Sequence, residues 1–340
     1  MSTLPHLSRL YADYLTLSEA PAGSNLRRWY GSDPISDAWM AEAPSPATIA
    51  IADALDQQAV EFGSSPEQIA SIAKLRVGAR AVVTGQQVGL LGGPLLTLLK
   101  AATAVARAQR ATAQTGVEHV PIFWLATEDH DLAEVDQITL PGAHTLEHLS
   151  LNLHSHSAEV GGIALGTGIE ALLDKVSELL GYAPICELLR RCYTPTATLG
   201  GAFARLMSAL FARHGLIVLD ASTRVFHALG ASTLRAAIER AEELELALQA
   251  RTGELEAAGY HAQVLVKPGS SLLFLIDEVS RQRQPLRRLP HGIWRAGQHS
   301  LSTADLLAIL ETAPERLSPN ALLRPLFQDT LLPTAAYIGG

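Results

Sequence analysis

The strongest pattern along the chain is an apolar strand, a glycine-rich loop, an apolar helix and a second apolar strand. The first strand covers 81–83 and the loop 84–93. Apolar residues then recur at helical spacing over 94–110, and the run 120–126 is apolar nearly throughout. A parallel strand–helix–strand crossover is right-handed and places the carboxyl ends of both strands at one edge of the sheet. The pattern therefore predicts an α/β fold with a ligand site at that edge.

Further periodic segments surround this unit. Residues 215–220 are typical of a buried parallel strand, and 224–258 predicts one long helix with a short heptad pattern. Further strands are predicted at 146–153, 261–267, 271–276 and 284–289, and further helices at 46–62, 65–75, 169–180, 184–192, 198–213 and 302–311. We expect an N-terminal helical region at 1–75, an α/β core with a helical insertion at 76–258, a β-rich connecting region at 259–300 and a return to the core at 301–340.

Composition narrows the class of protein. At 340 residues and 48% hydrophobic, the chain can bury a large core. A net charge of −8 without basic stripes argues against a nucleic-acid surface. No apolar run has transmembrane length, and Cys186 and Cys192 fit neither a zinc site nor a disulfide framework. We expect a cytoplasmic protein that binds neither membrane nor nucleic acid, with both cysteines in its core.

The glycine-rich loop is the first candidate binding element. It lacks the Gly-Lys-Ser/Thr of a P-loop and is not Gly-x-Gly-x-x-Gly, so it also fits a tight strand–helix connection. Two adjacent glutamines favour binding, because amides offer both donors and acceptors to a polar substrate. The candidate binding residues here are Thr84, Gly85, Gln86, Gln87, Gly92 and Gly93.

The helix after the loop adds a candidate anion site. Pro94 suits the first helical position, and a helix start presents free N–H groups and partial positive charge. Thr97 and Lys100 lie on one face of this helix. Lys100 stands among leucines, so its ammonium either extends to solvent or faces an anion.

Four consecutive ionisable residues, Glu128-Asp129-His130-Asp131, follow the second strand. Carboxylates are suitable ligands for Mg²⁺ and an accompanying nucleotide. Alternatively, His130 titrates near neutral pH and could serve in acid–base catalysis. A third interpretation is helix capping, for which Asp131 before Leu132 is well placed.

Three other polar groups are weaker candidates. His144, His148, His154 and His156 could supply metal ligands, but an exposed strand face is favoured. The arginines at 281, 283, 287 and 288 favour a solvated turn. Asn320, Arg324 and Gln328 form a polar stripe at helical spacing in an apolar segment, which indicates that they line a site.

Several of these blocks together resemble the bacillithiol biosynthesis cysteine-adding enzymes. The blocks are Thr84–Gln87, Gly92–Leu95 with Thr97 and Lys100, Phe123–Asp131, Gly259–Val264, and Leu322–Leu326 with Gln328 and Asp329. They occur in the same order, from the N-terminal region to residue 340. Leu91 and Leu96 replace aromatic residues of that family, which is a mild departure.

The resemblance implies a Rossmann-like core of the nucleotidylyltransferase type, with inserted connecting regions and a helical coiled coil. It implies addition of L-cysteine to the amine of glucosaminyl-malate, the last step of bacillithiol synthesis, by a homodimeric enzyme. Members of that family continue beyond Tyr337-Ile338-Gly339-Gly340, so we expect most of the coiled coil to be missing here.

A carboxylate is a poor electrophile, so ATP would activate cysteine as an acyl-adenylate, and fixed donors would stabilise the phosphate charge. We expect that role for Gly92, Gly93, Thr97 and Lys100, while Gln86 and Gln87 orient the substrate. Glu128, Asp129 or Asp131 would hold an ammonium, a metal or the attacking amine, and His130 would accept a proton. Arg324, beside Asn320, Gln328 and Asp329, would bind the malate carboxylates. The alternatives are a non-catalytic nucleotide- or metabolite-binding protein and a metal-dependent hydrolase.

Overall fold

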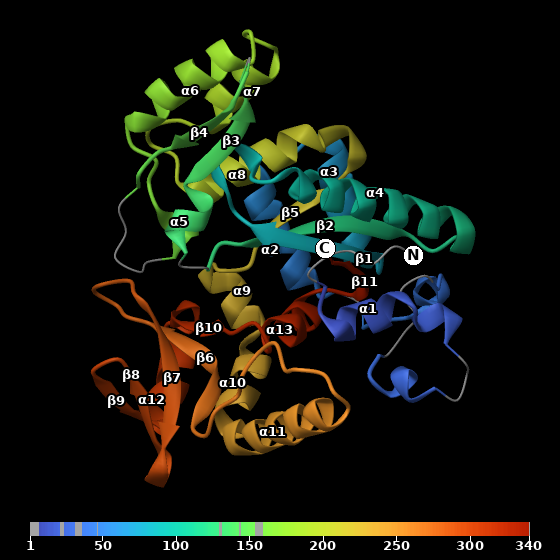
Figure 1. The fold of residues 1–340 in the computed structure, drawn as a ribbon, viewed down its shortest axis with the longest axis vertical. Coiled ribbons are helices and arrows are strands. Elements are labelled where there is room, and N and C mark those ends of the chain that lie inside the picture. The colour runs from blue at the N-terminus through green and yellow to red at the C-terminus, as the bar shows by residue number, and fades with distance from the viewer. Residues whose placement is uncertain are drawn as a thin grey trace.

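Four parallel strands form the sheet that organises the chain (Figure 1). They are β1 (Arg80–Gln87), β2 (His119–Ala126), β5 (Ile217–Asp220) and β11 (Thr334–Ile338), in the order β11-β1-β2-β5. The structure is a computed structural model, and it describes residues 7–20, 24–30, 36–45, 47–128, 131–142, 144–153 and 159–339. The predicted parallel α/β core and the predicted strand at 215–220 are confirmed.

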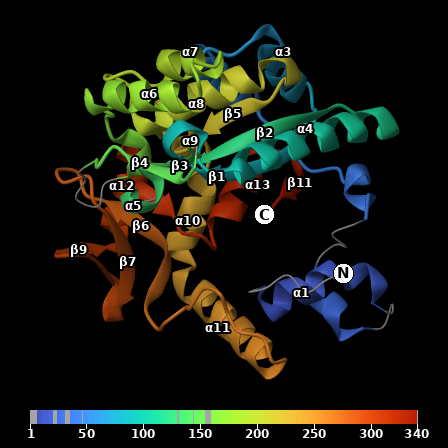
Figure 2. The same cartoon turned by 45° about the horizontal axis from the view of Figure 1, so that its top comes forward.

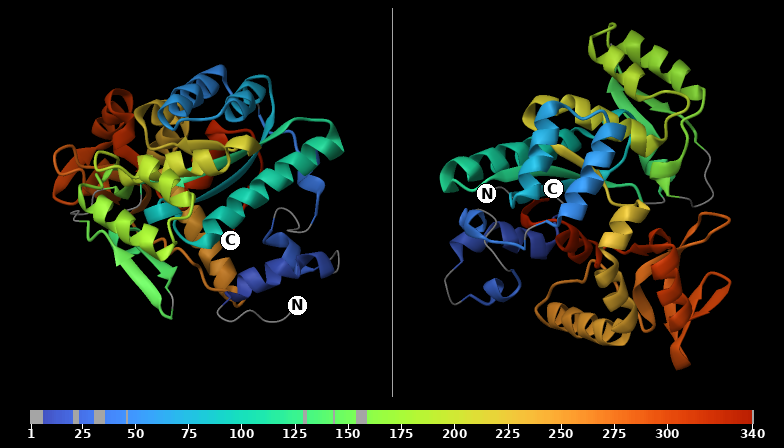
Figure 3. Two further views of the ribbon diagram at one scale, coloured as in Figure 1. Left: turned by 90° about the horizontal axis from the view of Figure 1, so that it is seen from above. Right: turned by 180° about the vertical axis from the view of Figure 1, so that it is seen from behind.

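Helices cover both faces of this sheet because its strands carry apolar side chains on both sides. Trp124 packs in the same cluster as α2 (Ile49–Glu61) and α3 (Pro66–Arg76), which lie in front of the sheet in the rear view of Figure 3. Phe123, which precedes Trp124 in β2, packs with α8 (Leu199–Leu210) on the other face of the sheet. The crossover between β1 and β2 is the long helix α4 (Leu95–Thr115).

A second, antiparallel sheet forms the connecting region. Its strands are β6 (Ser270–Ile276), β7 (Arg283–Leu289), β8 (Ile293–Ala296), β9 (His299–Ser302) and β10 (Leu317–Pro319), in the order β10-β6-β7-β8-β9. The predicted strands at 271–276 and 284–289 are confirmed. The strand predicted at 261–267 is wrong: the segment forms no strand, and both edges of β6, the strand that follows it, are occupied by β7 and β10.

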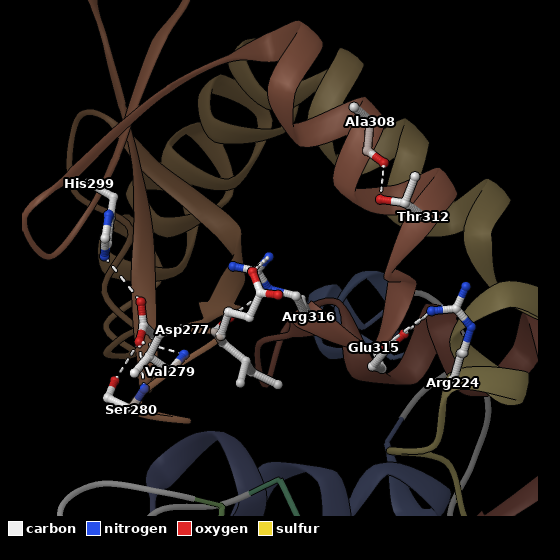
Figure 4. Close-up of polar contacts among 11 residues, drawn as sticks. Arg224, Asp277, Val279, Ser280, His299, Ala308, Thr312, Glu315 and Arg316 are labelled. Atoms are coloured by element: carbon white, nitrogen blue, oxygen red, sulfur yellow. Dashed lines mark hydrogen bonds and ion pairs between the residues drawn. The ribbon is translucent and has the colours of Figure 1, made fainter.

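One ion pair joins the connecting region to α9 (Arg224–Leu229), and further polar contacts stabilise the region itself (Figure 4). Arg224, the first residue of α9, lies 3.3 Å from the Glu315 carboxylate. Arg316 Nε donates to the Ile276 carbonyl at 3.1 Å. Asp277 accepts hydrogen bonds from the Ser280 backbone and hydroxyl, which lower the pKa of its carboxyl to about 2. The connecting sheet therefore has a defined place beside α9.

The remaining elements are short helices and one hairpin. They are α1 (Arg9–Leu15), α5 (Leu132–Val135), β3 (Gln137–Pro141), β4 (Leu146–Ser150), α6 (Gly168–Leu179), α7 (Ile185–Cys192), α12 (Thr303–Thr312), α13 (Arg324–Leu331), and 3-10 turns at Leu17–Glu19, Asn25–Arg28, Ala38–Ala41, Leu90–Gly92, Val160–Gly162, Ala212–His214, Pro290–Gly292 and Pro314–Arg316. The predicted helices in these regions are confirmed, with bounds shifted by a few residues. No helix in the described ranges is long and apolar enough to cross a membrane.

The single long helix predicted at 224–258 is wrong. Three helices occupy it, α9 (Arg224–Leu229), α10 (Ala231–Glu239) and α11 (Ala241–Ala257). The first break is at Gly230, where a Cβ atom would lie 2.2 Å from the Phe327 ring. Close packing of α13 against this point therefore decides the bend, and the heptad pattern does not lie on one continuous helix.

Strand β1 is longer than predicted and takes in the first half of the predicted loop. Thr84, Gly85, Gln86 and Gln87 pair with β2 residues, so the loop itself begins at Val88. Gly85 is required by packing, since a Cβ atom there would lie 2.8 Å from the Trp124 carbonyl oxygen. Pro94 is the residue before α4 rather than its first helical residue.

Substitution Gly85→Ala should destabilise the protein by about 1–3 kcal/mol, because backbone of the central sheet would have to move. Gly253→Ala is the matched control: it lies on exposed α11 with nothing within 4 Å of an added Cβ. There alanine should stabilise by about 0.5–1 kcal/mol. Denaturant unfolding of both variants measures the difference. Equal effects at the two positions would contradict the packing argument.

Candidate active site

Two cationic side chains converge at the carboxyl ends of β1 and β11. Lys100, on α4, is 8% exposed, and its Nζ donates to the Gly85 carbonyl at 2.7 Å and to Gln86 Oε1 at 3.2 Å. Burial lowers the pKa of the Lys100 ammonium, and the charge of Arg324 lowers it further. A bound anion would offset both effects. The two cations therefore make this edge a candidate anion site.

Arg324 reaches the same region from the start of α13. Its guanidinium carbon lies 5.8 Å from the Trp124 ring centroid and 5.4 Å from that of Tyr337. Its Nη1 donates to Gln328 Oε1 at 2.9 Å, and Gln328 is 2% exposed. Two residues of the predicted polar stripe thus lie together here, and the buried Gln328 positions the Arg324 guanidinium. Figure 2 shows α13 and β11 beside β1.

The first turn of α4 faces this pair with an unpaired hydroxyl. Thr97 is fully buried, and its Oγ1 has no hydrogen-bond partner. It lies next to Gly93, 3.5 Å from where a Cβ atom of that glycine would be. The N–H groups of Gly92 and Gly93 themselves donate to the carbonyls of Gly89 and Leu90. Donors for an anion would therefore come from the start of α4 rather than from those two glycines.

A cleft of about 760 Å³ opens from this edge toward the β3–β4 hairpin. Its polar lining includes Gln86, Gln87, Glu134, Gln137, Thr139 and His148. Gln87 Nε2 lies 3.5 Å from Glu134 Oε2, so the two walls touch at that point. The predicted glutamine pair therefore faces a cavity large enough for a small polar substrate.

Carboxylates gather on the other side of the same edge, at the ends of β2 and β5. Glu128 follows β2, keeps 16% of its side chain exposed, and lies 3.5 Å from Nε2 of the fully buried His227 on α9. Burial raises the pKa of Glu128, but His227, Arg283 and Ser318 outweigh burial and the pKa lies below its ordinary value. Glu159 is half-buried nearby, and burial together with the Glu128 charge raises its pKa to about 7.

Asp220 ends β5 beside this group and is held entirely by protein donors. Its Oδ1 accepts from Thr127 Oγ1 at 2.7 Å, from Ser222 N at 3.0 Å and from Ser222 Oγ at 2.7 Å. Burial still raises the pKa of Asp220. These bonds fix Asp220 Oδ1 at the edge of the sheet.

Several predicted site residues have other roles or positions. Thr84 donates to the Ile338 carbonyl at 2.9 Å and joins β1 to β11. Asp131 caps α5, as the capping alternative predicted, by accepting from Glu134 N at 3.3 Å. Asn320 lies before α13, where its Oδ1 caps a turn, and Asp329 is exposed. Asp129 and His130 lie outside the described residues.

The weaker sequence candidates are the histidine cluster, the two cysteines and the arginine run. His144 and His148 are exposed, His154 and His156 lie outside the described residues, and no three His, Cys, Asp or Glu residues gather for a metal in the part that the structure describes. Cys186 and Cys192 are free and buried, as predicted. The solvated turn predicted for the arginines is wrong for Arg283 and Arg288, which bind Ser318 and Glu245.

His227 and Glu159 are the residues that the sequence analysis missed. His227 lies in a helical pattern and Glu159 in an irregular connection, and neither is next to a motif. The position of Asp220 at the end of an apolar strand could have marked it as a residue near the site. Only the three-dimensional packing of α9 and the turn at Val160–Gly162 on β2 brings the other two to the site.

The fold and this site define the class: a Rossmann-like α/β protein with an antiparallel connecting sheet and a polar site at the carboxyl edge of its parallel strands. The family described as "Bacillithiol biosynthesis BshC, N-terminal Rossmann-like domain" matches residues 5–340. The chain belongs to that family.

Curated relatives agree with this assignment. A protein of Koribacter versatilis is 42% identical over all of this chain and 64% of its own length. Proteins of Salinibacter ruber and Geobacillus kaustophilus are 35% and 31% identical over 97% and 99% of the chain, and 62% and 64% of their own lengths. All three are named "Putative cysteine ligase BshC". The chain thus spans under two thirds of the length of these relatives.

Glu159→Gln should change how stability depends on pH. The folded-state pKa of about 7 lies above the ordinary value of 4.5, so the folded protein binds more protons between these values and loses stability as pH rises through 7. Because glutamine does not titrate, the variant should not show this loss of stability over this pH range. It should match the wild type near pH 5 and exceed it near pH 8, by on the order of 2 kcal/mol. Denaturant unfolding across this range is the measurement, and parallel pH curves would refute the raised pKa.

Proposed function

We propose that this chain forms the Rossmann-like part of a ligase that adds L-cysteine to glucosaminyl-malate in bacillithiol biosynthesis, with ATP activating the cysteine carboxylate. The names of the relatives support the ligase class and the pathway. The reaction is amide formation between a carboxylate and a primary amine.

The observation that carries the proposal is the pairing of Lys100 with Arg324 beside the start of α4. Burial lowers the pKa of Lys100, the charge of Arg324 lowers it further, and nothing anionic in the described residues hydrogen-bonds to its ammonium. The unpaired Thr97 hydroxyl and the first N–H groups of a long helix point to the same place. A nucleotide phosphate fits these donors, because fixed cations and dipoles stabilise charge that develops on phosphate oxygens.

The other residues at this edge would each bind a different group of the substrates. Gln86 and Gln87 line the cleft next to the anion site and would orient the cysteine and its activated carboxyl group. Arg324 can form a bidentate pair with a carboxylate or a phosphate. Mg²⁺ would arrive with ATP and be held largely by phosphates and water, as is usual for this ion. Glu128 and its neighbours lie on the opposite side and suit a cationic amine.

Lys100→Met and Arg324→Met should each weaken ATP binding by about ten-fold or more and lower product formation by about 100-fold, because each removes a fixed positive charge from the phosphate site. Calorimetry with ATP or ADP measures binding, and mass detection of the cysteinyl product measures turnover. The matched control is Lys175→Met on exposed α6, which should leave both unchanged.

Each outcome separates the alternatives. Wild-type turnover in both site variants would place the phosphate elsewhere. Nucleotide binding without product, with cysteine and glucosaminyl-malate present, would favour a non-catalytic binding protein. Hydrolysis that requires an added divalent metal would favour the hydrolase.

A further inference from the structure

Unpaired buried polar atoms concentrate around Glu128. Of the eight such side-chain atoms in the described residues, five belong to this region: Glu128 Oε1, Glu159 Oε1, Thr223 Oγ1 and both ring nitrogens of His227. Native proteins pair nearly all buried polar groups with protein or water. A concentration of this kind therefore indicates that a ligand group supplies the missing partners.

Among the described residues the protein completes this network only in part, through the His227–Glu128 ion pair and the contact of Ser318 with Glu128. Asp220 is satisfied by Thr127 and Ser222, and Arg283 is engaged by Ser318 and the Pro319 carbonyl. The Nε2–Oε1 distance of 3.5 Å between His227 and Glu128 suits an ion pair but does not make a hydrogen bond. The side-chain atoms left without a hydrogen-bond partner here are mainly carboxylate oxygens and imidazole nitrogens.

Backbone packing brings the two carboxylates to the end of β2. Glu128 lies two residues after that strand, and Glu159 immediately precedes the turn at Val160–Gly162. Gly161 N donates to the Thr127 carbonyl at 3.1 Å, and a Cβ atom at Gly161 would lie 2.4 Å from Thr127 Cβ. The two acids therefore meet by close backbone packing, so the charges cannot simply move apart.

We propose that Glu128, Glu159 and His227 form a binding site for a primary ammonium group. An ammonium carries three N–H donors and a positive charge, which matches several unpaired acceptors among two carboxylates. The groups that face Glu159 are Glu128 after β2, His227 on α9, and Arg281 and Arg283 of the connecting sheet. A divalent metal fits less well, because Glu128, Glu159 and His227 lie near one another but are not arranged to ligate a metal, and no other such group is found among the described residues.

This site rests on the proposed function, since both substrates proposed there carry a primary amine. It lies on the same face of the sheet as Arg324, with two aromatic rings between them. Arg324 lies over Trp124, the Trp124 and Phe327 centroids are 6.4 Å apart, and those of Phe327 and His227 are 5.4 Å apart. Strands β1 and β5 are two strand spacings apart, about 10 Å.

The test compares ligands with and without the amine. L-cysteine is paired with 3-mercaptopropionate, and glucosaminyl-malate with its N-acetyl derivative, in calorimetry on the wild type, Glu159→Gln and His227→Gln. One pair should show an amine preference of about 10- to 100-fold in the wild type, the loss expected for a charge-assisted hydrogen bond. Glu159→Gln should reduce this preference to within about 3-fold. Which pair responds identifies the amine that occupies the site.

The pH dependence provides a second readout. Between about pH 6 and 8, amine binding should strengthen in the wild type relative to Glu159→Gln, because the Glu159 carboxyl ionises near pH 7 and titration of the ligand affects both proteins alike. The control is Glu170→Gln on exposed α6, which should behave as the wild type. Glu159→Gln is nearly isosteric and only half-buried, so it remains informative if His227→Gln does not fold.

An unchanged amine preference in folded Glu159→Gln would overturn the site. So would Mn²⁺ binding by the wild type that the same variant loses while amine preference persists. These results are distinct from failure of the proposed function. If the wild type binds amines selectively but makes no product with ATP, the ligase proposal fails and the ammonium site stands.

Discussion

The parallel pairing of β11 with β1 is the contact on which the site depends. It aligns Val83 with Tyr337 and Thr84 with Ile338, and the Thr84 hydroxyl donates to the Ile338 carbonyl. Because α13 immediately precedes β11, this pairing brings Arg324 from the far end of the sequence to Lys100. Without it, α4 would present one buried lysine and no anion site.

The carboxyl edge of the sheet is divided by charge. Lys100 and Arg324 occupy the β11–β1 side, while Glu128 and Glu159 occupy the β2–β5 side. The rings of Trp124 and Phe327 lie between Arg324 and His227. These rings separate Arg324 from His227 and the carboxylates beside it. An edge of this kind is complementary to a pair of substrate groups of opposite charge.

Both halves of the edge weaken the folded state. Burial next to Arg324 lowers the pKa of Lys100, and burial beside Glu128 raises the pKa of Glu159, so both charged forms are disfavoured in the folded state. The apolar clusters on the two faces of the sheet offset this cost. Retaining such groups in a well-packed fold is typical of functional sites, where stability and activity compete.

Local sequence was sufficient for the parallel core, for most helices and for half of the site. Hydrophobic periodicity and punctuating glycines are short-range signals, so β1, α4, β2 and β5 could be predicted, together with Gln86, Lys100 and Glu128 at their ends. The bend at Gly230 could not be predicted, because it depends on close packing against the Phe327 ring of α13, which is distant in sequence.

His227 and Glu159 belong to the site only through packing of segments far apart in sequence, and no local pattern encodes such a contact. The extent of β1 was likewise decided by its neighbours, since strand pairing with β2 extended it through residues whose composition favours a loop. The sequence alone determined where polar groups follow strands. Tertiary structure decided which of them remain unpaired, because hydrogen-bond satisfaction depends on every element that packs around a group.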